Sequence, residues 1–267
     1  MQASVIISYY KTIPNLELIL MAFNKQTAKG EFEVIISEDA DTVETVQFLN
    51  VIRPTLAFPV QHISQEDKGF RKCKALNKAI QFVSTDFIIF IDGDCIPHRK
   101  FIEEYLKEKK EGRVLFGRRV MLSEKLTKQL LITKKLKKIN LFNLLITRCE
   151  RVEEGFYLPS VTKYLKEKNE GILLGCNMGI FKKDIVAING FDEDYESAGG
   201  GEDTDIEWRL QAMGGITFYS MKFKAIVYHL YHIVRFSKGD VMPNQYVVDN
   251  KKREGFFICK NGLKKIQ

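Results

Sequence analysis

Cysteine is sparse in this sequence, and its spacing excludes two kinds of small cross-linked domain. Five cysteines occur in 267 residues. Their number is odd, they are widely separated, and no two form a Cys-x-x-Cys pair. A disulfide framework needs paired cysteines and a zinc knuckle needs closely spaced ligands, so neither is expected. The thiols are predicted to be reduced, which predicts a cytosolic protein.

Long apolar runs and glycine-rich phosphate loops are also missing. No run of eighteen apolar residues occurs, so no membrane span is expected. Ser4 to Ile7 already resembles a strand, which leaves no room for a signal peptide. Neither Gly-x-Gly-x-x-Gly nor Gly-x-x-x-x-Gly-Lys-Ser/Thr is present, which argues against an ordinary dinucleotide fold and a P-loop NTPase. Any bound diphosphate would need a metal ion and basic side chains such as Arg71.

The composition is that of an ordinary globular protein with a basic balance. Hydrophobic residues make up 45% of the chain and charged residues 28%. The length suits one large α/β domain. The net charge of +7 favours anionic partners such as nucleotides, lipid head groups or nucleic acid, without choosing among them.

Strand-like and helix-like segments alternate through the first hundred residues. Strands are predicted at residues 5–7, 32–36, 60–63 and 87–91, with amphipathic helices between them. The strands at 5–7 and 87–91 are expected to be buried, and the strand at 60–63 is the weakest of the four. This alternation is typical of right-handed βαβ units and a parallel sheet. Polar clusters follow the strands, so they should meet at one edge of the sheet, where a nucleotide would lie. The helix after Asp41 is expected to turn Val43 and Val46 inward.

Two acids follow the most apolar of these strands, in the sequence Asp92-Gly93-Asp94. Carboxylates one residue apart would repel each other unless a cation lay between or beside them. A divalent ion with oxygen ligands would meet this need and would also hold phosphate oxygens. The alternative is a polar turn in which Gly93 supplies the bend.

Residues 125–146 form a basic segment with an apolar stripe. Six lysines and no acid lie between Lys125 and Lys138, and Ile132, Leu136, Ile139 and Phe142 share one helical stripe. A basic amphipathic helix can lie on an anionic bilayer, which predicts peripheral membrane contact at the inner face of the cell membrane. The alternative is a packed helix with a solvated lysine face.

A second acidic cluster opens a helix in the carboxyl-terminal half. Three glycines precede Glu202-Asp203-Thr204-Asp205, and the predicted helix turns Ile206, Leu210 and Met213 inward. An acid in the first helical turn is oriented and stays ionised, which suits a general base. The alternative is compensation of the helix dipole. A later strand at residues 225–228 precedes His229 and His232, which are either structural or metal ligands.

Five ordered motifs between Val5 and about His232 resemble the inverting, nucleotide-sugar-dependent glycosyltransferases of GT-A type, family 2. They are Ile6 to Tyr10, Glu33 to Asp41, Gln65 to Arg71 followed by Asn77, Asp92-Gly93-Asp94, and the region from Gly175. That last region is similar to the galactosyltransferase-type carboxyl-terminal region of chondroitin-polymerase-like enzymes.

The resemblance implies roles for individual residues. The donor would be a nucleoside diphosphate sugar, UDP-linked, with Mn²⁺ or Mg²⁺ as the cofactor. Asp203 would be the general base, with Glu202 beside it. Donor contacts are implied for Ser8, Tyr9, Glu38, Asp39, Lys68, Arg71, Asp92, Gly93 and Asp94, and metal contacts for Asp94, Asp92, His229 and His232. The acceptor would be a carbohydrate or lipid-linked hydroxyl in polysaccharide or glycolipid synthesis, and nucleic acid is not an expected partner.

Two positions depart from the family pattern. Relatives often carry a sugar-binding tryptophan where this chain has Ala198, which leaves the acceptor open. The second strand ends Ser37-Glu38-Asp39-Ala40 where many relatives have Asp-Asp-Gly-Ser, so either Glu38 or Asp39 could hold the base.

The predicted fold is therefore α/β, with a mixed, mostly parallel GT-A sheet flanked by helices in a single domain with an acceptor-side insertion. The expected divisions are a nucleotide-sugar-binding half (1–122), a basic amphipathic helical insertion (123–170), an acceptor and catalytic half (171–235) and a tail (236–267). A sugar-nucleotide nucleotidyltransferase is one alternative, although its glycine-rich first loop is missing. A non-enzymatic basic module that binds membrane or nucleic acid is the other, although it would not explain acids at three strand ends.

Overall fold

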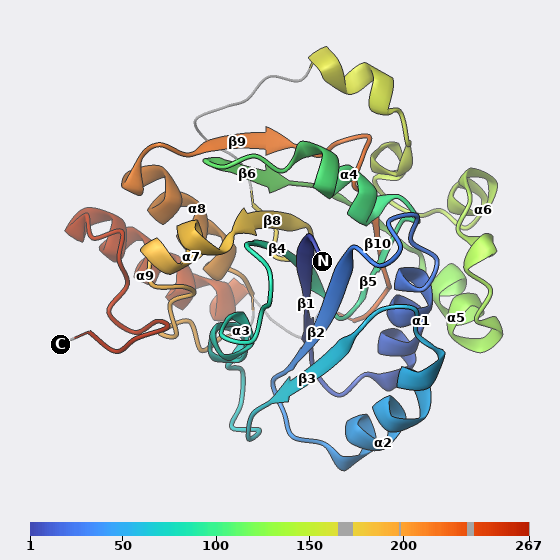
Figure 1. Cartoon of the computed structure of the whole chain (residues 1–267), viewed down its shortest axis with the longest axis horizontal. Coiled ribbons are helices and arrows are strands. Elements are labelled where there is room, and N and C mark those ends of the chain that lie inside the picture. Colours follow the sequence, from blue (N-terminus) through green and yellow to red (C-terminus); the bar gives the residue numbers. More distant parts are fainter. Residues whose placement is uncertain (165–172, 198, 234–237, 267) are drawn as a thin grey trace.

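A computed structural model describes residues 1–164, 173–197, 199–233 and 238–266 of the chain. In this part a seven-stranded sheet forms the centre (Figure 1). Its strands are β1 Ala3–Tyr9, β2 Phe32–Glu38, β3 Val60–Ser64, β4 Phe87–Asp92, β6 Arg113–Phe116, β8 Met178–Phe181 and β9 Thr217–Ser220. Their spatial order is β3-β2-β1-β4-β8-β6-β9.

A smaller sheet lies beside the first. It has the order β5-β10-β7, with β5 at Cys95–Pro97, β7 at Arg119–Met121 and β10 at Val227–His229. Strand β10 runs antiparallel to β5 and parallel to β7. This sheet therefore joins the segment after β4 to a segment near the end of the chain.

Helices cover both faces of the central sheet (Figure 1). On one side lie α1 Ile13–Phe23, α2 Val43–Ile52, α4 Phe101–Glu108, α5 Glu124–Thr133 and α6 Leu141–Ile146. On the other lie α3 Lys72–Ile80, α7 Lys182–Ala187, α8 Glu202–Met213 and α9 Lys238–Glu254. Short 3-10 turns complete the described elements: η1 Arg53–Thr55, η2 Leu136–Lys138, η3 Val152–Gly155 and η4 Pro159–Tyr164.

Strand β4 shows why this sheet forms. Phe87, Ile89 and Ile91 pack into the core on one face, and Ile88 and Phe90 pack into the core on the other. A strand apolar at every position is stable only between two helical layers, because alternate side chains point to opposite faces. The predicted fully buried strand is confirmed.

The first four strands are parallel, as predicted, and the sheet then reverses. Strands β1 to β4 pair in parallel, whereas β8 runs antiparallel to both β4 and β6. The segment from Arg113 to Val120 is not one strand, because the chain breaks at Gly117 and passes from one sheet to the other. A side chain at Gly117 would collide with Asn177, whose amide bonds the carbonyl of Arg118 there.

The prediction of one amphipathic helix over residues 125–146 is wrong, because the structure has two separate helices there. Helix α5 ends at Thr133, and the next residue, Lys134, adopts a left-handed conformation and pairs with Glu17. A new helix, α6, starts where the side chain of Asn140 accepts a hydrogen bond from the backbone of Asn143. This N-terminal cap explains why a second helix begins there. Leu136 between them is packed against the core.

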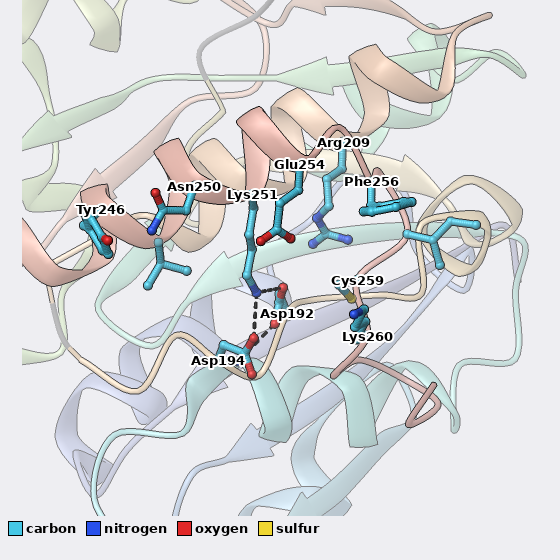
Figure 2. Close-up of a pocket in the computed structure, with 12 residues that line it drawn as sticks. Asp192, Asp194, Arg209, Tyr246, Asn250, Lys251, Glu254, Phe256, Cys259 and Lys260 are labelled. Atoms are coloured by element: carbon cyan, nitrogen blue, oxygen red, sulfur yellow. Dashed lines mark hydrogen bonds and ion pairs between the residues drawn. The ribbon is translucent and has the colours of Figure 1, made fainter. Parts of the chain in front are cut away.

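Two smaller expectations also fail. Val43 and Val46 are exposed, because α2 instead turns Thr45 and Leu49 inward. The segment treated as a tail contains α9, whose Lys251 forms ion pairs with Asp192 and Asp194. A cavity of about 340 Å³ lies beside that contact (Figure 2).

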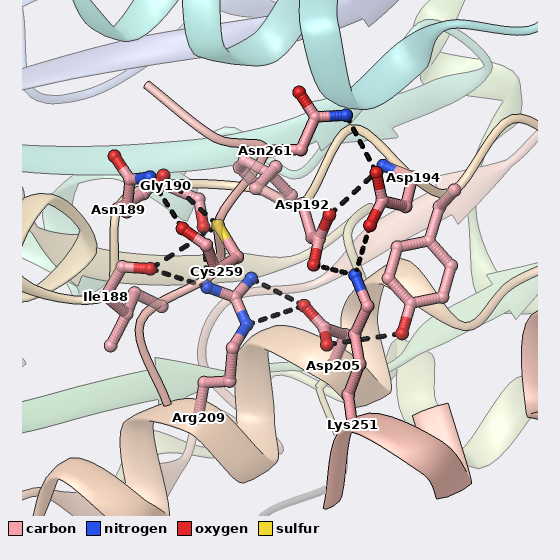
Figure 3. A network of polar contacts seen from close by, with 12 residues as sticks. Ile188, Asn189, Gly190, Asp192, Asp194, Asp205, Arg209, Lys251, Cys259 and Asn261 are labelled. Atoms are coloured by element: carbon pink, nitrogen blue, oxygen red, sulfur yellow. Dashed lines mark hydrogen bonds and ion pairs between the residues drawn. The ribbon is translucent and has the colours of Figure 1, made fainter. Parts of the chain in front are cut away.

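Helix α8 is fixed by a buried ion pair (Figure 3). Arg209 Nε donates to Asp205 Oδ2 at 2.6 Å, and Arg209 Nη1 donates to the carbonyls of Ile188 at 2.7 Å and Gly190 at 2.9 Å. Trp208 and Tyr195 donate to the other oxygen of Asp205. Arg209 is 1% exposed and Asp205 0%. These bonds attach α8 to the turn after α7, and so set where α8 begins.

Replacing Arg209 with Met is expected to lower the free energy of unfolding by about 3–5 kcal/mol, because Asp205 would keep a buried charge without its partner. Denaturant unfolding measures the change. The exposed Arg253 of α9 is the matched control, and Arg253→Met should shift the same free energy by less than about 0.5 kcal/mol. Equal effects of the two variants would contradict the assigned role of the pair.

Candidate active site

The carboxyl ends of β1, β2 and β4 bring their polar residues to one edge of the sheet. The register pairs Tyr9 with Glu38 and Ser8 with Asp92. Beside this edge, a pocket of about 490 Å³ opens between the end of β1 and the start of α2. Tyr9, Thr42 and Thr45 contribute to its lining. The two threonines were missed in the sequence, because nothing in their local pattern marks them.

Glu38 and Asp39, both considered for the base, differ in accessibility. Glu38 is 0% exposed, and its oxygens accept hydrogen bonds from Thr42, Thr45 and His62. Asp39 is 8% exposed and accepts from the backbone of Arg71 at 2.6 Å. Burial raises the pKa of Asp39 above its usual value. Glu38 therefore holds Thr42 and Thr45 in place at the pocket, and Asp39 is the acid nearer the surface.

The basic residues expected near the phosphates have different surroundings. Arg71 precedes α3 and is partly buried, and its guanidinium donates to the backbone carbonyl of Glu66. Lys68 is exposed and forms an ion pair with Glu66 at 2.8 Å. Of these two residues, the fold thus holds Arg71 at the sheet edge and leaves Lys68 on the outer loop.

Gly93 allows the turn after β4 to lie against β1. Its amide donates to the carbonyl of Ser8 at 2.6 Å. An added Cβ would stand 2.8 Å from that carbonyl oxygen, which is closer than real side chains approach. The glycine therefore serves a close backbone contact, which holds Asp92 and Asp94 at the end of the sheet.

Lys72 joins the two acidic clusters and was missed in the sequence. Its ammonium lies 3.0 Å from Asp92 Oδ1 and 3.2 Å from Glu202 Oε1. Burial alone would lower the pKa of Lys72, but the charges of Asp92, Glu202 and Asp203 raise it well above its usual value. The residue stays a cation. Its only sequence signal was a basic residue beside Arg71, in a stretch that already contained several lysines.

Glu202 and Asp203 begin α8 after a turn that requires glycine. Gly201 has a φ of 111°, a conformation that side chains disfavour. Asp203 Oδ2 accepts a hydrogen bond from the backbone of Gly175 at 2.8 Å. Within the described residues, Asp203 Oδ1 and Glu202 Oε2 have no hydrogen-bond partner. Two buried acceptors left without donors are costly unless a ligand satisfies them.

The electrostatics around Asp203 favour a group that exchanges protons near neutral pH. Burial, followed by the charge of Glu202, raises the pKa of Asp203 to about 7, and the charge of Lys72 opposes this rise. A base works best when its pKa lies near the working pH. Asp203 therefore has the chemistry of a general base.

Asp94, His229 and His232 form a cluster suited to a metal ion. One ligand atom of each lies within 4.8 Å of the others, and both histidine Nε2 atoms are 3.2 Å from Asp94 Oδ2. The pairing of β10 with β5 explains the contact, because it sets His229 opposite Cys95, next to Asp94. Burial opposes ionisation of Asp94, but hydrogen bonds from the two histidines hold its pKa well below the usual range.

The side chains of this cluster fit a divalent ion. Of the four residues predicted to bind the metal, the cluster contains three. Two imidazoles and a carboxylate suit Mn²⁺ better than Mg²⁺, which prefers oxygen. His229 is buried, and its Nδ1 has no partner among the described residues. Asp92 is not in this cluster, because it pairs with Lys72 instead.

Two further positions, Asn77 and Ala198, are part of the family pattern in the sequence. Asn77 exchanges hydrogen bonds with the backbone of Phe191, so it attaches α3 to the Asn189-Gly190 turn and has a structural role. Ala198, where relatives often carry tryptophan, lies outside the described residues.

A mostly parallel sheet with acids and histidines at its strand ends is the architecture of GT-A-type glycosyltransferases. The family model described as glycosyl transferase family 2 matches residues 4–185. A second, described as the N-terminal domain of galactosyltransferase, matches residues 161–233. The chain belongs to glycosyl transferase family 2. The predicted family, fold and enzyme class are confirmed.

Curated relatives match over part of the chain. It is 25% identical to chondroitin synthase of Pasteurella multocida over 118 residues, which is 43% of this chain and 12% of that protein. It is 30% identical to glycosyltransferase AglE of Haloferax volcanii over 101 residues, 38% of this chain and 33% of that protein. The chain thus spans a third or less of the length of these relatives.

Solved structures share the fold over most of the chain. TarS of S. aureus, residues 1–349 in complex with UDP, has a TM-score of 0.58 and 17% identity, covering 94% of this chain and 65% of that one. The mannosyltransferase PcManGT of Pyrobaculum calidifontis, in complex with GDP-Man and Mn²⁺, has a TM-score of 0.59 and 14% identity, covering 88% and 58%. Among the described residues, no helix is long and apolar enough to cross a membrane.

Replacing His229 with Gln is expected to weaken Mn²⁺ binding in the presence of UDP by about tenfold or more, because the cluster loses a buried nitrogen ligand. Isothermal titration measures the affinity. His98, which packs against Tyr157, is the matched control, and His98→Gln should bind Mn²⁺ as the parent does. Unchanged binding in both His229→Gln and Asp94→Asn would exclude this cluster as the metal site.

Proposed function

We propose that the chain is a metal-dependent, inverting glycosyltransferase that moves a sugar from a UDP-linked donor to an acceptor hydroxyl. One observation carries this proposal: Lys72 contacts both Asp92 at the end of β4 and Glu202 at the start of α8. The donor edge of the sheet and the acidic helix start therefore face a common space.

The donor would lie along the ends of β1, β2 and β4. Its base would occupy the pocket beside Tyr9, with Ser8 and Asp39 at the edge, and Arg71 would face the diphosphate. Of the two acids first considered for the base, the surroundings favour Asp39, since it is 8% exposed and Glu38 is 0% exposed. The complex of TarS with UDP, in a protein that shares this fold, supports a UDP-linked donor.

The metal would be held by Asp94, His229 and His232, with Mn²⁺ preferred over Mg²⁺. When bound, such an ion neutralises negative charge on a departing diphosphate. PcManGT, whose structure is a complex with GDP-Man and Mn²⁺, supports this choice. Asp92 would act through Lys72 and hold that ammonium at the donor edge.

Asp203 would take the acceptor proton. Its free Oδ1 would accept hydrogen from the acceptor hydroxyl while that oxygen bonds to the anomeric carbon and the diphosphate leaves from the opposite face. This single displacement inverts the anomeric centre. Glu202, whose Oε2 also lacks a partner among the described residues, would orient the acceptor.

The surroundings of the site give less information on the acceptor. A carbohydrate or lipid-linked hydroxyl in polysaccharide or glycolipid synthesis remains the proposal, and the relatives named as synthases of chondroitin and hyaluronan support it. Membership of glycosyl transferase family 2 argues against the nucleotidyltransferase and the non-enzymatic module. Location in the cytosol stays a prediction.

Replacing Asp203 with Asn is expected to reduce Mn²⁺-dependent hydrolysis of UDP-sugars by about 10²–10⁴-fold, because the amide cannot accept the proton of the attacking hydroxyl or water. UDP binding should persist. A screen of UDP- and GDP-sugars without acceptor measures turnover, and isothermal titration measures binding. Asp184→Asn is the matched control, because it also removes an acid that interacts with a helix dipole from the first turn of a helix. Loss of UDP binding in Asp203→Asn would reassign the residue to the donor site.

The rate of transfer is expected to fall as the pH drops below about 7, because Asp203 must be deprotonated to act and its pKa is raised to about 7. In Lys72→Met, loss of the neighbouring positive charge should raise that pKa. The acidic limb of the pH–rate profile should then move to higher pH. Exposed Lys74 on the same helix is the matched control. An acidic limb at the same pH in Lys72→Met and Lys74→Met would contradict this electrostatic link.

A further inference from the structure

Helix α6 turns its apolar side chains toward solvent. Leu141 is 47% exposed, Phe142 71%, Leu145 60% and Ile146 62%, whereas only Leu144 of this helix is buried. Surface helices normally bury such a face. The apolar face of α6 therefore has no partner within the described part of the chain.

The segment that carries this apolar face is strongly basic. Between residues 125 and 149 the chain has seven lysines and arginines and no acid. Lys128 pairs with Glu124 and Lys134 with Glu17, both outside this interval. Lys135, Lys137 and Lys138, in the turn that leads into α6, form no ion pair with any described residue. The positive charge next to the apolar face is thus not neutralised by ion pairs with the residues that the structure describes.

Helix α5 extends this surface and connects it to the candidate metal site. Ile132, near the end of α5, is 81% exposed. At the other end of α5, Thr127 accepts a hydrogen bond from the backbone of Tyr231 at 2.9 Å, between His229 and His232. Figure 1 shows α5 and α6 on the same side of the molecule, away from α7 to α9.

We propose that this surface, defined by Ile132, Lys135, Lys137, Lys138, Phe142, Leu145 and Ile146, docks on a bilayer that contains anionic lipids. The exposed apolar side chains would enter the boundary of the head groups and acyl chains, and the lysines would contact lipid phosphates. Nucleic acid would match the lysines but would leave several exposed aliphatic side chains without a role. A bilayer matches both properties.

Docking in this way would bring the candidate active site beside the membrane. The bilayer contact itself does not depend on the chemistry proposed above. Only its consequence, access to a lipid-linked acceptor, rests on the proposed function. Vesicle binding and UDP-sugar hydrolysis therefore test the two proposals separately.

The test uses the full chain in co-sedimentation with vesicles. One set contains phosphatidylcholine alone, and the other contains equal parts of phosphatidylcholine and phosphatidylglycerol. The chain should sediment with the second set, and binding should weaken as salt is raised. Equal binding to both sets, or none to either, would overturn the proposal. Competition by a short DNA duplex that removes the chain from anionic vesicles, with tighter binding to the duplex, would assign the surface to nucleic acid instead.

Substitutions locate the contact. The triple variant Lys135→Gln, Lys137→Gln, Lys138→Gln should lower the vesicle partition coefficient by about a hundredfold, at about fivefold for each lysine. Lys252, Lys260 and Lys264, exposed in the carboxyl-terminal segment, form the matched triple, which removes the same net charge. An equal loss in both triples would show that overall charge, and not this surface, drives binding.

The apolar face has its own pair of variants. Phe142→Ser with Leu145→Ser should reduce binding to anionic vesicles at least tenfold and should leave UDP binding unchanged. The control pair is Val51→Ser with Phe82→Ser, two exposed apolar residues elsewhere, at 77% and 47% exposure. Thermal unfolding checks that each variant is folded. Retained vesicle binding in Phe142→Ser with Leu145→Ser would overturn the role of α6.

Discussion

The ion pairs of the partly buried Lys72 ammonium are the interactions on which the candidate site depends. Asp92 and Glu202 come from distant parts of the chain, and each would be costly to bury as an unpaired charge. One cation between them offsets both charges and places the start of α8 against the end of β4. The arrangement leaves one oxygen of Glu202 and one of Asp203 buried without a hydrogen-bond partner among the described residues.

The repulsion expected between Asp92 and Asp94 is resolved in a way that separates their roles. Asp92 turns to Lys72, and Asp94 turns to His229 and His232. The two acids therefore act on different neighbours, although they are one residue apart. This division explains why the metal-suited cluster contains one carboxylate and two imidazoles, and why Mn²⁺ is the better match.

Local patterns were sufficient for the strands and insufficient for the points where the chain changes direction. The apolar run of β4 and the glycines before α8 were readable, because burial and turn chemistry act within a few residues. The break at Gly117 was not readable, because it depends on the side chain of Asn177, 60 positions later in the sequence. Lys134, at the break after α5, likewise pairs with a distant residue, Glu17.

From the sequence alone, the α/β fold, the family resemblance and the acids and histidines at the sheet edge could be predicted, since these follow from periodicity and residue type. The tertiary structure decided which of those groups are neighbours. It placed Lys72 next to Glu202, 130 residues away, set His229 beside Asp94 through strand pairing, and turned the apolar side of α6 outward. Contacts of this kind depend on how distant segments pack, and no local pattern encodes them.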